Sequence, residues 1–107
     1  MTTAIDVKNH LELLVLTALK KGPGHGYAII GAIRERSGGE LELLEGSLYP
    51  ALHRLERDGL LTSSWSEVGG RKRRVYTLSS KGSATLDAQQ RDWRRFERAM
   101  NLVLADG

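Results

Sequence analysis

Residues 47–79 read SLYPALHRLERDGLLTSSWSEVGGRKRRVYTLS, a pattern that predicts a helix followed by a β-hairpin. Its first part carries leucines at helical spacing, at Leu48, Leu52 and Leu55. This spacing turns one apolar face toward a core and predicts a helix over residues 47–58. A glycine directly after the segment is a common helix stop, and a β-rich stretch follows it.

The start and the outer face of this predicted helix follow from the same residues. Pro50 lacks an amide proton and is tolerated only in a first helical turn, so we expect the helix to begin at Ser47, whose hydroxyl can cap it. Polar and basic side chains then face outward, and they are Ser47, Tyr49, His53, Arg54 and Arg57. Such side chains can donate to phosphates, and arginines can also reach guanine edges.

Two β-rich segments complete the stretch, over residues 60–67 and 73–79. The Gly-Gly pair between them favours a hairpin turn. Four consecutive basic residues lie at the tip of this hairpin: Arg71, Lys72, Arg73 and Arg74. A basic run is often only a solvated turn, but its position directly after an exposed basic helix favours binding to nucleic acid.

Two further helices are predicted upstream, over residues 6–21 and 25–37, with a short strand over residues 40–44. The first is apolar on more than one side. The inner face of the second is expected to consist of Tyr27, Ile30 and Ile33.

A long helix is predicted over residues 80–105. Leu86, Trp93 and Met100 recur every seven residues, and Gln89, Phe96 and Val103 follow three positions later. This pattern is typical of a helix that pairs with a second copy, through Leu86, Trp93, Phe96, Met100 and Val103. Trp93 has two interpretations: it packs between two subunits, or it lines a gap for a planar ligand together with Trp65.

Composition excludes several classes of function. The 107 residues contain no cysteine, which excludes a disulfide framework, a thiolate metal site and a cysteine nucleophile. The three histidines are far apart and no nucleophile–base arrangement is present, so we expect no metal, no cofactor and no enzyme activity. Apolar runs are too short for a membrane span and no signal peptide is evident, so we expect a cytoplasmic protein without membrane contact.

Charge is distributed unevenly. The net charge is +3, but residues 54–107 carry 11 basic and 7 acidic side chains. An excess of basic residues in one half favours an anionic partner there. The partner expected is double-stranded DNA.

The order of elements indicates a mainly α fold with a small β-hairpin. We predict a winged helix-turn-helix over residues 1–79 and a C-terminal dimerisation helix over residues 80–107. In this architecture the third helix enters the major groove, and the hairpin, or wing, lies along the backbone or the minor groove. The alternative is a winged helix that binds another protein, with the basic wing only a solvated loop.

Three segments carry a resemblance to a known family. Residues 11–30 (LELLVLTALKKGPGHGYAII), 45–61 (EGSLYPALHRLERDGLL) and 69–82 (GGRKRRVYTLSSKG) together resemble the PadR family of bacterial transcriptional regulators, in its short subgroup with a single C-terminal helix. The resemblance implies a homodimeric repressor that binds a palindromic operator at its own and neighbouring genes. In some members a small molecule releases the DNA.

The resemblance also implies roles for single residues. Ser47, Tyr49 and Arg54 match positions that the family uses to contact DNA. The N-terminal helix is expected to join the dimer interface, which adds Leu11 and Leu14 to it. An aromatic effector site between the subunits would use Trp65, Trp93 and Phe96.

Overall fold

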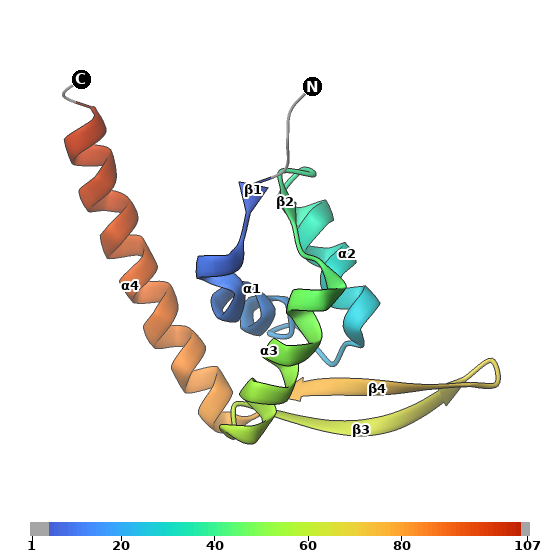
Figure 1. The fold of residues 1–107 in the computed structure, drawn as a ribbon. Helices are drawn as coiled ribbons and strands as arrows, with labels where there is room; N and C mark the ends of the chain where they lie inside the picture. Colours follow the sequence, from blue (N-terminus) through green and yellow to red (C-terminus); the bar gives the residue numbers. More distant parts are fainter. Residues whose placement is uncertain (1–4, 106–107) are drawn as a thin grey trace.

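The computed structural model describes residues 5–105 and has a mainly helical fold with one hairpin (Figure 1). Its elements in chain order are β1 (Ile5–Asp6), a 3-10 helix η1 (Lys8–His10), α1 (Leu11–Ala18), α2 (Gly26–Arg36), β2 (Leu41–Glu42), α3 (Glu45–Arg57), β3 (Leu61–Val68), β4 (Arg71–Leu78) and α4 (Ser80–Leu104). This order confirms the fold class expected from the sequence.

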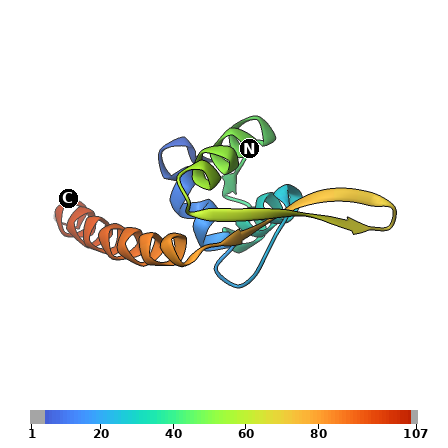
Figure 2. The same ribbon diagram turned by 90° about the horizontal axis from the view of Figure 1, so that it is seen from below.

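Three parts of the molecule extend in different directions. Helices α1, α2 and α3 pack into a small body, the β3–β4 hairpin projects from one side of it, and α4 rises from the base of the hairpin (Figures 1 and 2). The body and the hairpin are joined by a further backbone pairing, because Gly24 in the α1–α2 loop exchanges two hydrogen bonds with Tyr76 of β4, at 3.0 and 2.9 Å. The hairpin therefore starts from a fixed base.

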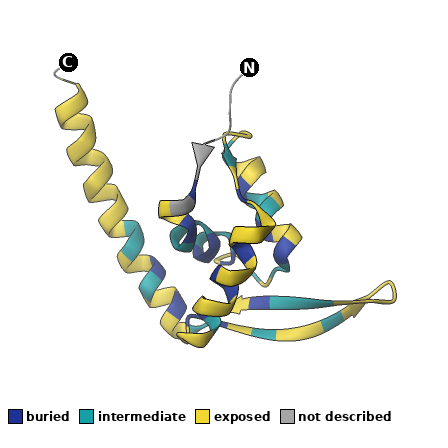
Figure 3. Cartoon of the chain, viewed as in Figure 1, coloured by how far each residue is buried: buried dark blue, intermediate teal, exposed yellow. Residues whose placement is uncertain are grey.

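The core lies where the three short helices meet the base of the hairpin and the start of α4 (Figure 3). Leu48, Leu52 and Leu55 of α3 are fully buried, as their spacing predicted. The inner face of α2 differs in part from its prediction. Ile33 is buried as predicted and Ile30 is half-buried, whereas Tyr27 is 62% exposed. Gly26 and Ile29 are buried in its place.

Helix α3 begins two residues before the predicted start, at Glu45, so Ser47 is not its cap. The Leu44 carbonyl accepts from the amides of Ser47 and Leu48, both at 3.0 Å, which fixes the first turn earlier. Pro50 thus lies inside the helix. The carbonyl that it leaves without an amide partner is that of Gly46, an exposed residue that water can reach.

The N-terminal segment also differs from its prediction. The expected helix over residues 6–21 is divided into η1 and the shorter α1. The residues before η1 form β1, which pairs in parallel with β2 through Ile5–Leu41 and Asp6–Glu42. The predicted short strand at residues 40–44 is present as β2 and pairs with this N-terminal strand.

The hairpin turn is tighter than predicted. Gly69 and Gly70 have φ values of +60° and +78°, the two positive values that a two-residue hairpin turn requires. Strand β4 therefore begins at Arg71, two residues before the predicted start. The register places Trp65 opposite Arg74 and Val68 opposite Arg71.

Helix α4 is anchored at its start and exposed along its second half. The Ser79 hydroxyl accepts from the Gly82 amide and donates to the Gly59 carbonyl, while Leu86 is buried against the body. From Arg91 onward every described residue of α4 is exposed. Among the described residues, no helix is long and apolar enough to cross a membrane.

Candidate nucleic-acid interface

The outer face of α3 presents its polar side chains to solvent as a continuous row. Its amphipathic sequence turns the leucines inward and leaves Ser47, Tyr49, His53, Arg54 and Arg57 exposed. The orientation predicted for these five side chains is therefore present. Arg57, at the C-terminal end, lies 3.8 Å from its neighbour Asp58, and both side chains are mostly exposed.

A hollow of about 430 Å³ connects this helix with the hairpin. It is lined by His25, Gly26, Tyr27, Tyr49 and the four basic residues 71–74. Tyr49 approaches the start of α2 so closely that a Cβ on Gly26 would lie 2.8 Å from its Cζ. The glycine allows this approach, so α2, α3 and the hairpin form one surface.

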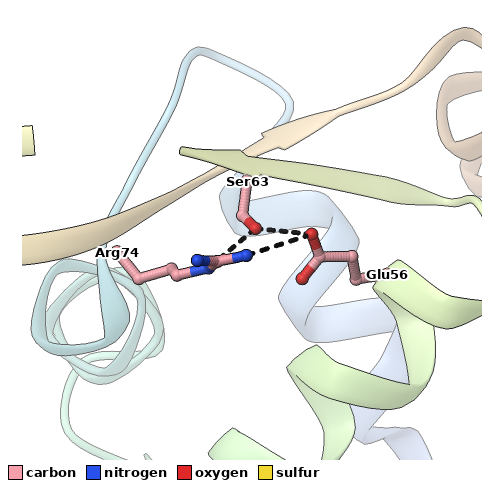
Figure 4. Close-up of polar contacts among 3 residues, drawn as sticks. All are labelled: Glu56, Ser63 and Arg74. Atoms are coloured by element: carbon pink, nitrogen blue, oxygen red, sulfur yellow. Dashed lines mark hydrogen bonds and ion pairs between the residues drawn. The ribbon is translucent and has the colours of Figure 1, made fainter. Parts of the chain in front are cut away.

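The four basic residues of the hairpin divide into two pairs. Arg71 and Lys72 are exposed next to the turn, whereas Arg73 and Arg74 are half-buried nearer the body. Arg73 Nη1 lies 3.0 Å from His25 Nε2, and Arg74 Nε donates to Ser63 Oγ at 2.9 Å (Figure 4). The structure thus gives two of the four predicted DNA ligands contacts within the chain.

Two tyrosines near this surface have altered acidities. A hydrogen bond to the Glu45 carboxylate raises the pKa of Tyr27. Burial raises the pKa of Tyr76, and the charge of Glu56 adds to it. Because the ordinary tyrosine value is already about 10, both hydroxyls are protonated at neutral pH. Sequence reasoning assigned Tyr27 to the core, but its polar group lies at the surface beside α3.

The aromatic residues expected to form an effector site are only partly brought together. Trp93 and Phe96 have ring centroids 5.9 Å apart, and His10 meets Trp93 edge-on at 5.2 Å. Trp65 lies on β3, 64% exposed, with the Arg74 guanidinium 5.2 Å above its ring. Within residues 5–105 of one chain, Trp65 therefore belongs to the hairpin and not to the Trp93 cluster.

An apolar groove of about 600 Å³ runs between α1 and α4 beside Trp93. Its lining includes Leu13, Leu14, Leu41, Trp93 and Arg94. Gln89 crosses from α4 to α1 and donates from Nε2 to Glu12 Oε1 at 2.9 Å. Its own Oε1 is buried without a hydrogen-bond partner in the described part of the chain.

The residues predicted for a dimer interface occupy two environments. Leu11 and Leu86 are buried in the chain's own core, and Leu14 is half-buried beside them. The other four are exposed on the outer half of α4, and they are Trp93, Phe96, Met100 and Val103.

Two polar residues that contact Arg74 were not singled out from the sequence. Glu56 and Ser63 meet Arg74 across the junction of α3 and the hairpin. A two-residue turn at Gly69-Gly70 would have given the strand register and placed Arg74 near Ser63. The approach of Glu56 carried no sequence signal, because it depends on the angle between α3 and the hairpin. Among the described residues, no three His, Cys, Asp or Glu side chains are grouped to hold a metal ion.

Comparison with known proteins identifies the family. The model of the PadR-like transcriptional regulator family matches residues 15–88. A crystal structure of a PadR family transcription regulator from a hypervirulent Clostridium difficile strain is 32% identical and superposes with a TM-score of 0.80, over 89% of this chain and 98% of that one. A Mycobacterium tuberculosis transcriptional regulator is 54% identical over 46 residues, which is 43% of each chain.

A further solved structure contains DNA. It is Bacillus subtilis PadR in complex with operator DNA, 27% identical with a TM-score of 0.69, over 75% of this chain and 46% of that one. The matched family consists of transcriptional regulators and not of enzymes. The winged-helix architecture and the match over residues 15–88 establish that the chain belongs to the PadR-like family of transcriptional regulators.

Proposed function

We propose that the chain binds operator DNA as a two-fold dimer and represses transcription. The observation that carries this proposal is the common surface of α3 and the hairpin, where Tyr49 of the helix and the four basic residues 71–74 border one hollow. A helix with exposed polar and basic side chains fits the major groove, and a basic hairpin beside it fits the adjacent backbone or minor groove. The family membership and the operator complex of the Bacillus subtilis relative support the same conclusion.

The residues of this surface have different tasks in the proposal. Ser47, Tyr49, His53 and Arg54 occupy the part of α3 that would enter the groove, so they read base edges or nearby phosphates. Arg71 and Lys72 are exposed and carry no base-specific geometry, so they neutralise phosphates. Arg57 is farther along the helix and contributes charge at the rim.

Dimerisation is proposed from the exposed half of α4. An isolated helix of about 15 residues is marginal in water, and an apolar stripe on it adds to its need for a partner. Phe96, Met100 and Val103 form such a stripe. We therefore assign residues 1–79 to DNA binding and 80–107 to dimerisation, with Leu11, Leu14 and Leu86 supporting the interface from the chain's own core.

An effector site is proposed at the same interface. The groove between α1 and α4 is mostly apolar, and Trp93 offers a flat ring at its edge. A planar small molecule that separates or rotates the two copies of α4 would change the spacing of the two α3 helices and so release the operator.

A gel-shift assay with the duplex upstream of the chain's own gene tests the main proposal. We expect a salt-sensitive shift at submicromolar protein and a complex that contains two chains per site. A reporter under the same promoter should be repressed. If no salt-sensitive shift occurs at micromolar protein, the alternative of a protein-binding winged helix replaces it.

A further inference from the structure

The junction between α3 and the hairpin contains a group of four side chains that come from three elements. Glu56 is in the last turn of α3, Ser63 and Trp65 are on β3, and Arg74 is on β4. Ser63 Oγ donates to Glu56 Oε2 and accepts from Arg74 Nε at 2.9 Å, while Arg74 Nη2 lies 3.7 Å from the same Glu56 oxygen (Figure 4). The single hydroxyl proton of Ser63 thus points to the carboxylate and its lone pair to the guanidinium.

The guanidinium of Arg74 is held from more than one side. Its Nε and Nη2 atoms contact Ser63 and Glu56, and its Cζ lies over the Trp65 ring, 5.2 Å from the ring centroid. The side chain is 40% exposed and that of Glu56 is 30% exposed, so the contact is partly shielded from solvent. Because the guanidinium is planar and rigid, it loses little side-chain entropy for each contact that it makes, so it is suited to connect two elements.

The β3–β4 hairpin projects away from the helical body, so its turn lies far from the three helices (Figure 1). Contacts near the base of the hairpin therefore affect where the turn lies. Its base is fixed by the Gly24–Tyr76 pairing, and Arg73 contacts His25 beside it. The Glu56–Ser63–Arg74 contacts connect the hairpin directly to α3. These contacts lie one step along the hairpin from the Gly24–Tyr76 pairing, toward the Gly69-Gly70 turn.

We propose that Glu56 and Arg74 are positioning residues, which hold the hairpin at the angle to α3 that operator binding requires. The inference rests on the proposed DNA-binding function and assigns Arg74 to this contact instead of to a phosphate. The negative charge of Glu56 itself opposes binding to DNA, which is a polyanion. Any favourable contribution of Glu56 therefore comes from the position in which it holds Arg74 and the hairpin.

The positioning role and simple electrostatics predict opposite effects of a Glu56 substitution on operator affinity. Removing the charge of Glu56 by Glu56→Gln would strengthen DNA binding if only charge mattered. We expect it to weaken operator binding by about three- to five-fold, the range for a partly exposed ion pair. The matched control is Glu67→Gln, which changes an exposed carboxylate on β3, opposite Lys72, and should leave operator affinity unchanged or raise it.

The double variant Glu56→Gln, Arg74→Ala separates the contact from two independent effects. If the residues act together, it binds operator no more weakly than Arg74→Ala alone. Operator binding by Arg74→Ala should also keep the salt dependence of the parent, because an Arg74 side chain that contacts Glu56 and no phosphate displaces no counterions from DNA. A Glu56→Gln variant that binds operator as tightly as Glu67→Gln does, or a fall of about one in the salt slope of Arg74→Ala, overturns the proposal.

A readout without DNA keeps this test independent of the proposed function. In a Trp93→Phe background, Trp65 is the single tryptophan of the chain. Glu56→Gln, which keeps the shape of the side chain and removes its charge, should lower the fluorescence anisotropy of Trp65, and Glu67→Gln should not. Failure of the parent protein to bind DNA would refute the proposed function. Equal anisotropy of Trp65 in the two variants would refute the positioning role of Glu56 and Arg74.

Discussion

Gly82, in the first turn of α4, lies directly against the backbone carbonyl of Leu60. A Cβ at position 82 would overlap the carbonyl oxygen and come within 3.0 Å of the carbonyl carbon and 2.9 Å of Leu78 Cδ1. Because the neighbour is backbone, it cannot rotate away. We expect Gly82→Ala to lower the free energy of unfolding by about 2 kcal/mol or more, measured by urea denaturation.

Gly31→Ala is the matched control for this substitution. Gly31 is exposed in α2, and a Cβ there would meet nothing within 4 Å. Alanine should therefore raise the free energy of unfolding by roughly 0.5–1 kcal/mol through its higher helix propensity. A Gly82→Ala variant as stable as the parent would contradict the close packing of α4 on the hairpin base.

The exposed pair at the hairpin tip should account for much of the salt dependence of DNA binding. We expect Arg71→Ala and Lys72→Ala each to weaken binding to every duplex and to reduce the slope of log K against log salt by about 0.9. Arg98→Ala, on the exposed outer half of α4, is the control and should leave the slope unchanged. Fluorescence anisotropy over a salt series measures all three, and equal slopes would exclude a phosphate contact by the tip.

Arg54 should affect sequence preference more than general affinity. It is exposed in the last turn of α3, and a guanidinium can bond two acceptors of a guanine. We expect Arg54→Ala to reduce the preference for operator over a scrambled duplex by about 1–3 kcal/mol. Competition binding with the two duplexes measures this. An equal loss for both would make Arg54 a phosphate ligand.

The sequence predicted the elements of this fold but not the contacts between distant ones. Leu48, Leu52 and Leu55 gave the orientation of α3 because helical periodicity is local. The start of α3 was predicted at Ser47, because Pro50 was expected only in a first helical turn. The helix begins earlier, because water can reach the exposed Gly46, whose carbonyl Pro50 leaves without an amide partner. The close approach of Gly82 to the Leu60 carbonyl carried no sequence signal, because only the tertiary structure brings the two residues together.

The candidate site was predictable to a similar extent. The outward face of α3 and the exposure of Arg71 and Lys72 agree with expectation. The contacts of Arg73 with His25 and of Arg74 with Glu56 join residues far apart in sequence, so periodicity carried no information about them. Trp65 and Trp93 were expected to meet between two subunits, and within one chain the hairpin register places Trp65 opposite Arg74.

The exposed apolar stripe of α4 leads to a prediction about assembly. Placing carboxylates in it with Phe96→Asp and Met100→Asp should convert the proposed dimer into monomers, or into unfolded chain, because buried charge without a partner is strongly unfavourable. Sedimentation velocity and circular dichroism distinguish these outcomes. Arg98→Asp, outside the stripe, should remain dimeric. A double Asp variant that stays dimeric and folded would place the interface elsewhere.

If α3 and the hairpin together bind operator DNA, the chain should distinguish its operator from other duplexes and should respond to salt. Binding of the full chain to the duplex upstream of its gene and to a scrambled duplex should be followed by anisotropy between about 50 mM and about 200 mM salt. We predict tighter binding to the upstream duplex at every salt concentration, with affinity for both duplexes falling steeply as salt rises. Equal binding to both, or binding that does not respond to salt, would contradict the account.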